Sequence, residues 1–510
     1  MAEFRLLLVC GLLMASSWST PLWALSLTAL RASVFKIQVM SDEPSLIEPW
    51  KRMLSSQGSG TGFYIGDGRI LTNAHVVANA SFITIQRDGD STPMPAVIRH
   101  IAHDADLALL EPLDDAGKKA LTELSPLTFG ALPRLRTPVS TIGFPLGGEQ
   151  LSVTDGVVSR VSYRRYVHHG SAQHLLVQVD SAINPGNSGG PVVQGNQVVG
   201  VAFQSYAQAE NTGYIIPTPV ISRFLRDIED GRYQGHPDDG LTVTDWAILN
   251  PSTAAFYRLK QGDGGVKITH VDLWAPTAGL LQSGDIILAI DGQSVGVDGK
   301  VNFSGERVDF RVIFDLKLIG DQCRFTVLRD GLRRDVTVAV LPAREHHVTG
   351  NIYARHPRYF VYGGLVFTVL SRNLLRTWGD KWYRDAPLAL RYLDSFASYD
   401  PEYANNQDII VLVKRLPDAV NAYATGNMFR VVKAVDGKRV GSISDLISAL
   451  EGGASEYAVI GFMGSQDPLV LSRSQVKARN SVINQKYGVA PDRWLTAADE
   501  QPLVPARERS

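Results

Sequence analysis

Short runs in which apolar and polar residues alternate follow one another from Ser33 to about Pro217. Valine, isoleucine and aromatic residues dominate these runs, and glycine, asparagine, aspartate and proline separate them, as in strands joined by turns. No long helical pattern interrupts the series. So many regularly spaced strands predict an all-β barrel or a pair of barrels. The runs include SVFKIQV, GTGFYIG, RILTNAHVV, SFITIQR, DLALL, VSTIGF, HLLVQVD and QVVGVAF.

The spacing becomes helical at residues 219–230, PVISRFLRDIED, where four apolar residues fall on one face. A polar linker, GRYQGHPDDG, comes next and ends the first domain, which we expect to span residues 30–232. The four residues on the apolar face are Ile221, Phe224, Leu225 and Ile228.

Two further domains are expected after this linker. Residues 240–343 mix strands with one or two short helices, and a second linker, LPAREHHVTG, follows them. Residues 350–490 form a third region, and residues 491–510 form a polar tail that we expect to be flexible. A chain of 510 residues is longer than one hydrophobic core usually serves, which agrees with three domains.

The first 24 residues have the features of an export signal. Arg5 precedes an apolar run from Leu6 to Met14, and the small residues after it fit a cleavage site near Ala24. We therefore expect residues 1–24 to be a signal peptide and the protein to be periplasmic or otherwise extracytoplasmic. An uncleaved anchor in the inner membrane is the open alternative, because the segment after Arg5 carries no charge up to Leu30.

The composition narrows the possible functions. A net charge of −1 and a charged fraction of 20% do not favour a nucleic-acid partner. No phosphate-binding or dinucleotide fingerprint occurs, so no cofactor is expected. The histidine pairs at 168–169 and 346–347 lack an HExxH motif or a spaced Cys/His cluster, so no metal site is predicted. Because Cys10 lies in the signal, Cys323 is expected to be an unpaired core residue.

The strongest chemical signal is NPGNSGGPVV, at residues 184–193. A serine hydroxyl is a poor nucleophile that needs a base and hydrogen-bond donors for the oxyanion it creates. Gly186 permits a tight turn that can direct main-chain N–H groups at one point. The motif therefore predicts Ser188 as the nucleophile and an oxyanion hole at Gly186, Asn187 and Ser188, with the N–H groups of Gly186 and Ser188 as its main donors.

A base and its carboxylate partner come earlier in the chain. LTNAHVV places His75 after a strand-like run, and HDADLALL places Asp106 directly before an apolar strand. Asp104, two residues earlier on the same strand face, is the competing choice for the carboxylate. The order His, Asp, Ser within an all-β domain of this size is typical of the chymotrypsin architecture. His75 would accept the serine proton, and Asp106 would fix the imidazole tautomer and stabilise the imidazolium.

At these residues the chain resembles the Deg/HtrA family of serine proteases. The matching strings are SGTGFYIGDGRILTNAHVV, DADLALL, TIGFPLG, TDGVVSRVS, VDSAINPGNSGGPVV and GYIIPTPVI, in the family's order. The resemblance implies a mainly β protein, in which a chymotrypsin-like double β-barrel is followed by two PDZ-like α+β domains. It also implies a pocket for small aliphatic side chains and an activation loop with an arginine, for which Arg164 or Arg165 is the nearest match. The pocket residues would be Ile183, Asn184, Gly213, Tyr214, Ile215 and Ile216.

The second and third domains resemble PDZ modules. VKITHVDLWAPTAGLLQSGDIILAIDGQSV has the PDZ pattern, and a carboxylate-binding loop is expected around Gly240 and Leu241. Such a loop would hold the C-terminus of a peptide that pairs as an added strand. The third domain, with YFVYGGLVFTVLSRNLLRTWGDKWYRD, is similar to the atypical second PDZ of some plant Deg proteases, a module that tends to serve assembly.

The resemblance implies an ATP-independent endopeptidase that degrades or processes unfolded proteins in extracytoplasmic quality control and the stress response. Its partners would be unfolded protein or peptide substrates, peptide C-termini at the first PDZ module, and further copies of the chain in a trimer-based homo-oligomer. A chaperone or scaffold that binds exposed C-termini with little proteolysis is one alternative. A processing protease with one folded, membrane-bound substrate is the other.

Overall fold

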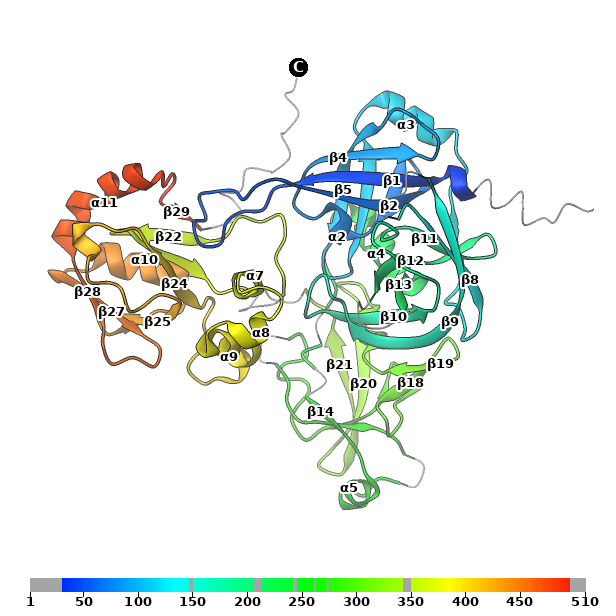
Figure 1. The fold of residues 1–510 in the computed structure, drawn as a ribbon. Coiled ribbons are helices and arrows are strands. Elements are labelled where there is room, and N and C mark those ends of the chain that lie inside the picture. The colour runs from blue at the N-terminus through cyan, green and yellow to red at the C-terminus, as the bar shows by residue number, and fades with distance from the viewer. Residues whose placement is uncertain are drawn as a thin grey trace, which may run out of the picture.

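Three modules, each built on its own sheet or sheets, make up the chain (Figure 1). In this computed structural model the described residues are 30–145, 150–205, 212–237, 239–241, 245–260, 263–272, 275–342 and 350–495. We call residues 30–230 the barrel module, residues 239–342 the middle module and residues 350–495 the C-terminal module.

The first half of the barrel module is a closed barrel of antiparallel strands in the order β1-β2-β3-β6-β5-β4. Alternation along the strands directs one set of side chains inward, as in β1, where Phe35, Ile37 and Val39 are buried. The strands are β1 (Val34–Ser41), β2 (Ser56–Gly66), β3 (Arg69–Thr72), β4 (Ala80–Arg87), β5 (Met94–Ala102) and β6 (Leu107–Pro112), with helices α2 (Ala74–Val77) and α3 (Asp115–Thr122).

The second half of the barrel module is a sheet in the order β11-β8-β9-β10-β13-β12-β7. An additional pairing of β11 with β12 closes six of these strands into a second barrel, and β7 pairs with β12 outside it. The predicted double barrel is therefore confirmed. The strands are β7 (Thr128–Phe129), β8 (Pro138–Gly143), β9 (Ser152–Arg165), β10 (Gln173–Val179), β11 (Pro191–Gln194), β12 (Gln197–Ser205) and β13 (Gly213–Pro217).

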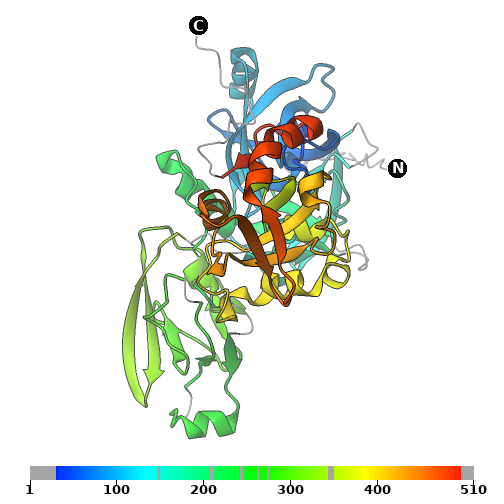
Figure 2. The same ribbon diagram turned by 90° about the vertical axis from the view of Figure 1, so that its left-hand side faces the viewer.

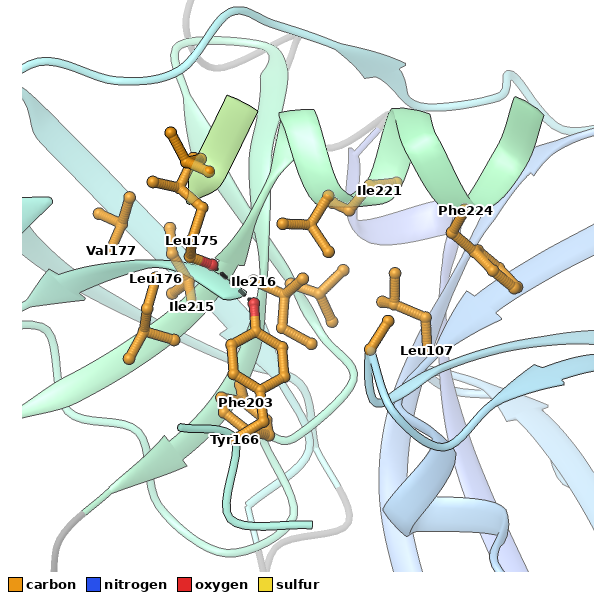
Figure 3. Packing of buried hydrophobic residues seen from close by; sticks show 14 of the residues in the cluster. Leu107, Tyr166, Leu175, Leu176, Val177, Phe203, Ile215, Ile216, Ile221 and Phe224 are labelled. Atoms are coloured by element: carbon orange, nitrogen blue, oxygen red, sulfur yellow. Dashed lines mark hydrogen bonds between the residues drawn. The ribbon is translucent and has the colours of Figure 1, made fainter. Parts of the chain in front are cut away.

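The helix predicted at residues 219–230 is α4 (Thr218–Asp227), continued by the 3-10 turn η1 (Ile228–Asp230). Ile221 and Phe224 extend from α4 toward Leu107 at the start of β6 and the buried residues of the second barrel (Figure 3). The apolar face of this helix therefore packs into the core where the two barrels meet.

The middle module contains a sheet in the order β14-β15-β16-β20-β21, with β17 paired to β16 and a separate hairpin of β18 and β19. Cys323 on β20 is buried and forms no disulfide, as expected. The elements are β14 (Trp246–Ile248), β15 (Val266–Ile268), β16 (Ile286–Ile290), β17 (Gln293–Ser294), β18 (Lys300–Phe303), β19 (Glu306–Asp309), β20 (Gln322–Arg329) and β21 (Leu332–Ala339), with helices α5 (Pro251–Phe256) and α6 (Val312–Asp315).

The C-terminal module contains a sheet in the order β28-β27-β25-β24-β23-β22-β29, with β26 paired to β25. Since β29 pairs with β22, ordered structure continues beyond the expected boundary at residue 490. The strands are β22 (Tyr359–Tyr362), β23 (Leu365–Val369), β24 (Ile410–Arg415), β25 (Arg430–Val435), β26 (Lys438–Arg439), β27 (Tyr457–Phe462), β28 (Leu469–Ser472) and β29 (Arg493–Trp494). The helices are α7 (Arg372–Arg376), α8 (Trp382–Asp385), α9 (Leu388–Phe396), α10 (Ile443–Gly452) and α11 (Arg473–Tyr487), with 3-10 turns η2 (Ala397–Tyr399) and η3 (Ala419–Asn421).

The two smaller modules join the barrel module differently. One continuous apolar cluster runs from the second barrel into the middle module and includes Val179 of β10 and Phe314 of α6. The C-terminal module has apolar clusters of its own, on which Leu46, Ile47 and Trp50 of the barrel module pack from outside. In both views the middle module extends away from the barrels (Figures 1 and 2). The C-terminal module stands to one side of the barrels in Figure 1 and therefore lies in front of them in Figure 2.

No helix in the described ranges has both the length and the apolarity needed to span a membrane. The predicted signal peptide at residues 1–24 and residues 496–510 of the predicted tail lie outside the described part of the chain.

Candidate active site

His75 and Asp106 form a doubly anchored pair at the edge of the first barrel. Asp106, fully buried directly before β6, accepts a hydrogen bond at Oδ2 from His75 Nδ1 over 2.6 Å. Its other oxygen, Oδ1, accepts the main-chain N–H of His75 over 2.6 Å. The Asn73 side-chain amide also donates to the Asp106 carbonyl over 2.9 Å, and Asp106 has a positive φ of 51°. Several contacts therefore hold Asp106 in an uncommon backbone conformation, and this conformation keeps its carboxylate against the imidazole.

The charges of the pair stabilise each other. Burial raises the pKa of Asp106, but the attraction and hydrogen bonds of His75 outweigh it and leave this pKa below its usual value. Burial likewise lowers the pKa of His75, but the Asp106 carboxylate outweighs it and leaves this pKa above its usual value. The arrangement therefore favours an imidazolium at residue 75, as a general base needs after it accepts a proton.

Ser188 lies in the loop between β10 and β11, and glycine is required beside it. A Cβ on Gly189 would lie 2.1 Å from the Thr61 carbonyl oxygen, and the φ of Gly189 is +85°. The loop is fastened to β2 by the N–H of Thr61, which donates to the Ser188 carbonyl over 2.8 Å. These constraints fix the backbone of Ser188 against the first barrel.

The side chains of Ser188 and His75 both lie beside Phe203. The Ser188 hydroxyl donates to the Phe203 carbonyl over 3.2 Å, and the Phe203 ring centroid is 6.3 Å from that of His75. The structure therefore joins His75 to Asp106 directly, whereas the hydrogen bond of Ser188 goes to the main chain of β12.

The three predicted oxyanion donors differ in their contacts. The N–H of Asn187 donates to the Asn184 carbonyl over 3.0 Å and is therefore engaged within its own turn. The N–H groups of Gly186 and Ser188 have no partner among the described residues, and Gly186 has a φ of +98°. The N–H groups of Gly186 and Ser188 therefore stay the predicted oxyanion donors.

Asp104, the competing carboxylate, is directed away from His75. Its Oδ1 accepts the Tyr233 hydroxyl over 2.7 Å, and its Oδ2 accepts the main-chain N–H of His236 over 2.9 Å. Asp104 thus fastens the linker after α4 to the barrel module, and Asp106 alone of the two contacts the imidazole.

The residues predicted to shape the substrate pocket lie on β13 of the second barrel and in the loop between β10 and β11. Ile183 is buried, and its side chain comes within 2.8 Å of the position that a Cβ on Gly213 would occupy. Gly213, Tyr214, Ile215 and Ile216 belong to β13, which pairs with β10 and β12, whereas Asn184 is exposed. Their role as a specificity pocket stays a prediction.

A contact that sequence reasoning missed lies beside His75. The imidazole of His168 lies 6.0 Å from that of His75, in a loop of residues 166–170. His168 Nε2 and His103 Nδ1 are 3.0 Å apart, and Tyr353 stacks on His168 with ring centroids 4.0 Å apart. Burial lowers the pKa of His103 to about 4 and that of His168 to about 3, so both rings are neutral near pH 7.

The partners of this loop come from the C-terminal module. Asn351 and Tyr353 donate from their side chains to the His168 carbonyl over 2.7 and 2.8 Å. Arg372 of α7 donates to the Gly170 carbonyl over 2.7 Å. No sequence signal links residues this far apart in the chain, so the contact was not predicted.

The two arginines predicted for an activation loop, Arg164 and Arg165, lie at the exposed end of β9. Of the two, Arg165 acts electrostatically on Asp394 of α9, whose carboxylate is paired with Arg372 over 3.0 Å. The connection between the loop and the C-terminal module is made chiefly by residues 168–170, and a sensing role for either arginine stays a prediction.

The predicted carboxylate-binding loop of the middle module is folded onto its own module. Leu241 is buried, and its N–H donates to Asp239 Oδ1 over 2.9 Å. Its carbonyl accepts from Arg311 over 2.8 Å, and the Gly240 carbonyl accepts the N–H of Asp272 over 3.2 Å. A peptide carboxylate at this loop would have to compete with the bond to Asp239.

Comparisons with known proteins agree with this architecture. A family model described as a trypsin-like peptidase domain matches residues 60–201, and a PDZ domain model matches residues 348–494. The chain is 35% identical over 422 residues to Protease Do-like 4, mitochondrial, of Arabidopsis thaliana, covering 82% of this chain and 76% of that protein. It is 34% identical to Protease Do-like 2, chloroplastic, of the same plant, covering 90% and 74%.

Among solved structures, the HtrA-type protease AlgW with a tripeptide is 25% identical with a TM-score of 0.47. The match covers 63% of this chain and 97% of that one.

Proposed function

The chain belongs to the Do-like (HtrA) family of serine endopeptidases, and from this premise we propose that it cleaves peptide bonds with a Ser188–His75–Asp106 triad. The pairing of both Asp106 oxygens with His75 carries the proposal. It holds the imidazole with Nδ1 occupied and leaves Nε2 as the nitrogen available to Ser188.

The chemistry begins with rotation of the Ser188 side chain. Its hydrogen bond to the Phe203 carbonyl is long at 3.2 Å, so turning the hydroxyl toward His75 Nε2 costs little. His75 then takes the proton as Ser188 attacks the scissile carbonyl, and Asp106 stabilises the imidazolium. The N–H groups of Gly186 and Ser188 stabilise the oxyanion, and His75 returns its proton to the leaving amine before water releases the acyl group.

The substrates that we propose are unfolded or misfolded proteins, with the role of extracytoplasmic quality control. An extended chain can pair with an enzyme strand, whereas the same residues inside a folded protein cannot. The named relatives are mitochondrial and chloroplastic proteases, which supports work in a compartment outside the cytosol. Capture of peptide C-termini by the middle module and a trimer-based homo-oligomer belong to the same proposal.

Labelling with a fluorophosphonate tests the nucleophile directly. The full chain should be labelled once, at Ser188, and should hydrolyse unfolded casein, because an activated serine reacts with both. The Ser188→Ala variant should lose labelling and about a million-fold of the rate. Ser55→Ala, which removes an exposed hydroxyl bonded to Asp42, is the matched control and should keep both activities.

Suppression of aggregation by Ser188→Ala as effective as that by the unchanged chain would add a chaperone role. Labelling of Ser188→Ala at the normal level would instead overturn the assignment of the nucleophile.

A further inference from the structure

Three metal-binding side chains that the proposed chemistry does not use meet at the junction of the barrel and middle modules. His174 lies on β10, His236 on the linker after α4, and Asp315 at the end of α6. One donor atom of each lies within 4.8 Å of the other two, and all three residues are buried. Both His174 Nδ1, at 2.9 Å, and His236 Nδ1, at 3.0 Å, approach Asp315 Oδ1.

Main-chain carbonyls indicate which ring nitrogens carry hydrogen. His174 Nε2 lies 3.0 Å from the Asp104 carbonyl oxygen, and His236 Nδ1 lies 3.1 Å from that of Asp315. A carbonyl oxygen only accepts, so these two nitrogens are the N–H groups. In neutral rings the lone pairs are then at His174 Nδ1 and His236 Nε2. An imidazole whose second nitrogen is fixed by a main-chain carbonyl is the form in which histidine usually binds metals.

Hydrogen bonds among the described residues leave some buried polar atoms of this cluster without a partner. His174 Nδ1 lies 2.9 Å from a carboxylate oxygen, and this contact needs either a second proton on the ring or a cation bound to both atoms. Burial lowers the pKa of His174, but the Asp315 carboxylate outweighs it and leaves this pKa above its usual value, so the proton is the competing explanation. Asp315 Oδ2 and His236 Nε2 are buried and have no hydrogen-bond partner among the described residues. Buried polar atoms are rarely left without a partner, and a cation bound to Asp315 Oδ2 and His236 Nε2 would give each of these two atoms a partner.

We infer that His174, His236 and Asp315 bind one divalent transition-metal ion, for which zinc is the best match. Two imidazoles and one carboxylate form a ligand set that zinc favours. Donors around tetrahedral zinc are about 3.3 Å apart. One donor atom of each of the three residues lies within 4.8 Å of the other two, so a small movement of the side chains would bring them into coordination. Asp315 Oδ2 or a water molecule would complete the coordination.

The ion would fasten two modules together rather than take part in hydrolysis. Its ligands come from the barrel module, the linker and the middle module, and Asp104 braces two of them through its carbonyl and its carboxylate. Bound zinc would therefore stabilise the docked position of the middle module against separation from the barrels.

Zinc itself is the probe for the test. The full chain is stripped with a chelator, dialysed against zinc chloride and analysed for metal per chain, and its thermal unfolding is followed with and without zinc. We expect about one zinc per chain and a higher Tm with zinc. Cobalt(II) in place of zinc should give the visible absorption of a tetrahedral site, which nonspecific surface binding does not give.

Two near-isosteric variants test the ligands without removing bulk from the core. In Asp315→Asn and His236→Gln, zinc affinity should fall by about a hundredfold, and zinc should no longer raise the Tm. His356→Gln is the matched control, since His356 also lies near a main-chain carbonyl but in the C-terminal module, and it should bind zinc normally.

Circular dichroism and labelling of Ser188 show that each variant is folded. The site is refuted if the unchanged chain binds no more zinc than the two variants, or if zinc leaves its Tm unchanged. Either result would mean that a proton on His174, rather than a metal ion, separates it from Asp315.

Discussion

The middle and C-terminal modules differ in what attaches them to the barrels. The middle module shares an apolar core with the second barrel, reinforced by Arg311, whose guanidinium lies 5.1 Å from the Tyr163 ring centroid. The C-terminal module encloses its own cores, on which Leu46, Ile47 and Trp50 of the barrel module pack from outside. It also contacts the barrels through polar and aromatic groups, of which Tyr353 lies next to the active site. The module that keeps separate cores thus supplies a side chain beside the active site.

This difference separates two ways of influencing an enzyme. Burial of apolar surface holds a module in place, but it is non-directional, so it does little to set the positions of individual atoms in the active site. Hydrogen bonds to the carbonyls of residues 168 and 170 are directional, so a small shift of the C-terminal module alters the loop beside His75. Variants of the two attachments should therefore affect different measurements.

Among the variants that bear on this comparison, the largest effect is expected at Asp106, which pairs with His75 within the barrel module itself. Asp106→Asn should lower kcat/KM by about ten-thousandfold, because the amide no longer stabilises the imidazolium or selects its tautomer. Hydrolysis of a short chromogenic peptide measures this loss and sets the scale for the module variants. A loss of less than tenfold would show that another group supports His75.

The pH dependence of the same reaction reports the charge around His75. Hydrolysis needs neutral His75, and Asp106 raises its pKa above the usual 6.5, so kcat/KM should rise with a midpoint above pH 6.5. His168, the neighbouring ring, is neutral in this range and should not add a second step. In Asp106→Asn the midpoint should move to lower pH, and an unchanged midpoint would mean that the carboxylate does not act on the imidazole.

Breaking the middle-module attachment should change stability. Arg223 of α4 is fully buried, pairs with Asp227 over 3.2 Å and donates to the Lys317 carbonyl of the middle module over 3.1 Å. Arg223→Met leaves that carboxylate and carbonyl short of a donor and should lower the unfolding free energy by about 3–5 kcal/mol. Urea unfolding measures it, and Arg384→Met, at an exposed pair with Asp385, is the control expected to change little.

Breaking the C-terminal attachment should change catalysis with little change in stability. Tyr353→Ala removes the ring stacked on His168 and one hydrogen bond to its carbonyl, and should lower kcat/KM about tenfold as the loop loses its position. Peptide hydrolysis and thermal unfolding together measure the split. Tyr423→Ala, at a fully exposed aromatic residue of the same module, should leave kcat/KM and Tm unchanged. If the two variants behave alike, Tyr353 does not position the loop beside His75.

The smallest effect is expected at the outer edge of this attachment. Lys414 of the C-terminal module pairs with Glu48 of the barrel module over 3.3 Å in a partly exposed position. Glu48→Gln should reduce stability by less than about 1 kcal/mol, and the difference should shrink at high salt. Thermal unfolding at low and high ionic strength tests this, and a salt-independent loss would indicate a role other than charge pairing.

Alternation and turn residues are local signals, so the sequence pattern predicted one β-barrel or a pair of barrels, and the resemblance to the Deg/HtrA family implied the double barrel. The apolar face of residues 219–230 predicted the position of α4. The sequence also predicted Asp106 as the partner of His75, with Asp104 as the alternative. Both residues precede the same strand, and only the structure shows that Asp106 contacts His75 whereas Asp104 contacts Tyr233. The spacing of residues along a strand does not say which neighbour a carboxylate meets.

The contacts between modules were not predictable from sequence. Tyr353 meets His168 across 185 residues, and Asp315 meets His174 across 141. No periodicity or motif spans such distances, because these pairs depend on how finished modules pack. For the same reason the absence of spaced Cys/His motifs in the sequence did not indicate that the fold brings His174, His236 and Asp315 together.

The hydrogen bond from Asn351 to the carbonyl of His168 can form only after the ribosome has made both residues, long after the barrel module is complete. The two residues are 183 positions apart, and at about 5–20 residues per second a ribosome needs roughly 10–40 s to make the intervening chain. A barrel module that folds as it emerges therefore spends this interval with its serine in place and the neighbouring loop unsupported. A nascent chain would acquire its full activity only after the last module has been translated.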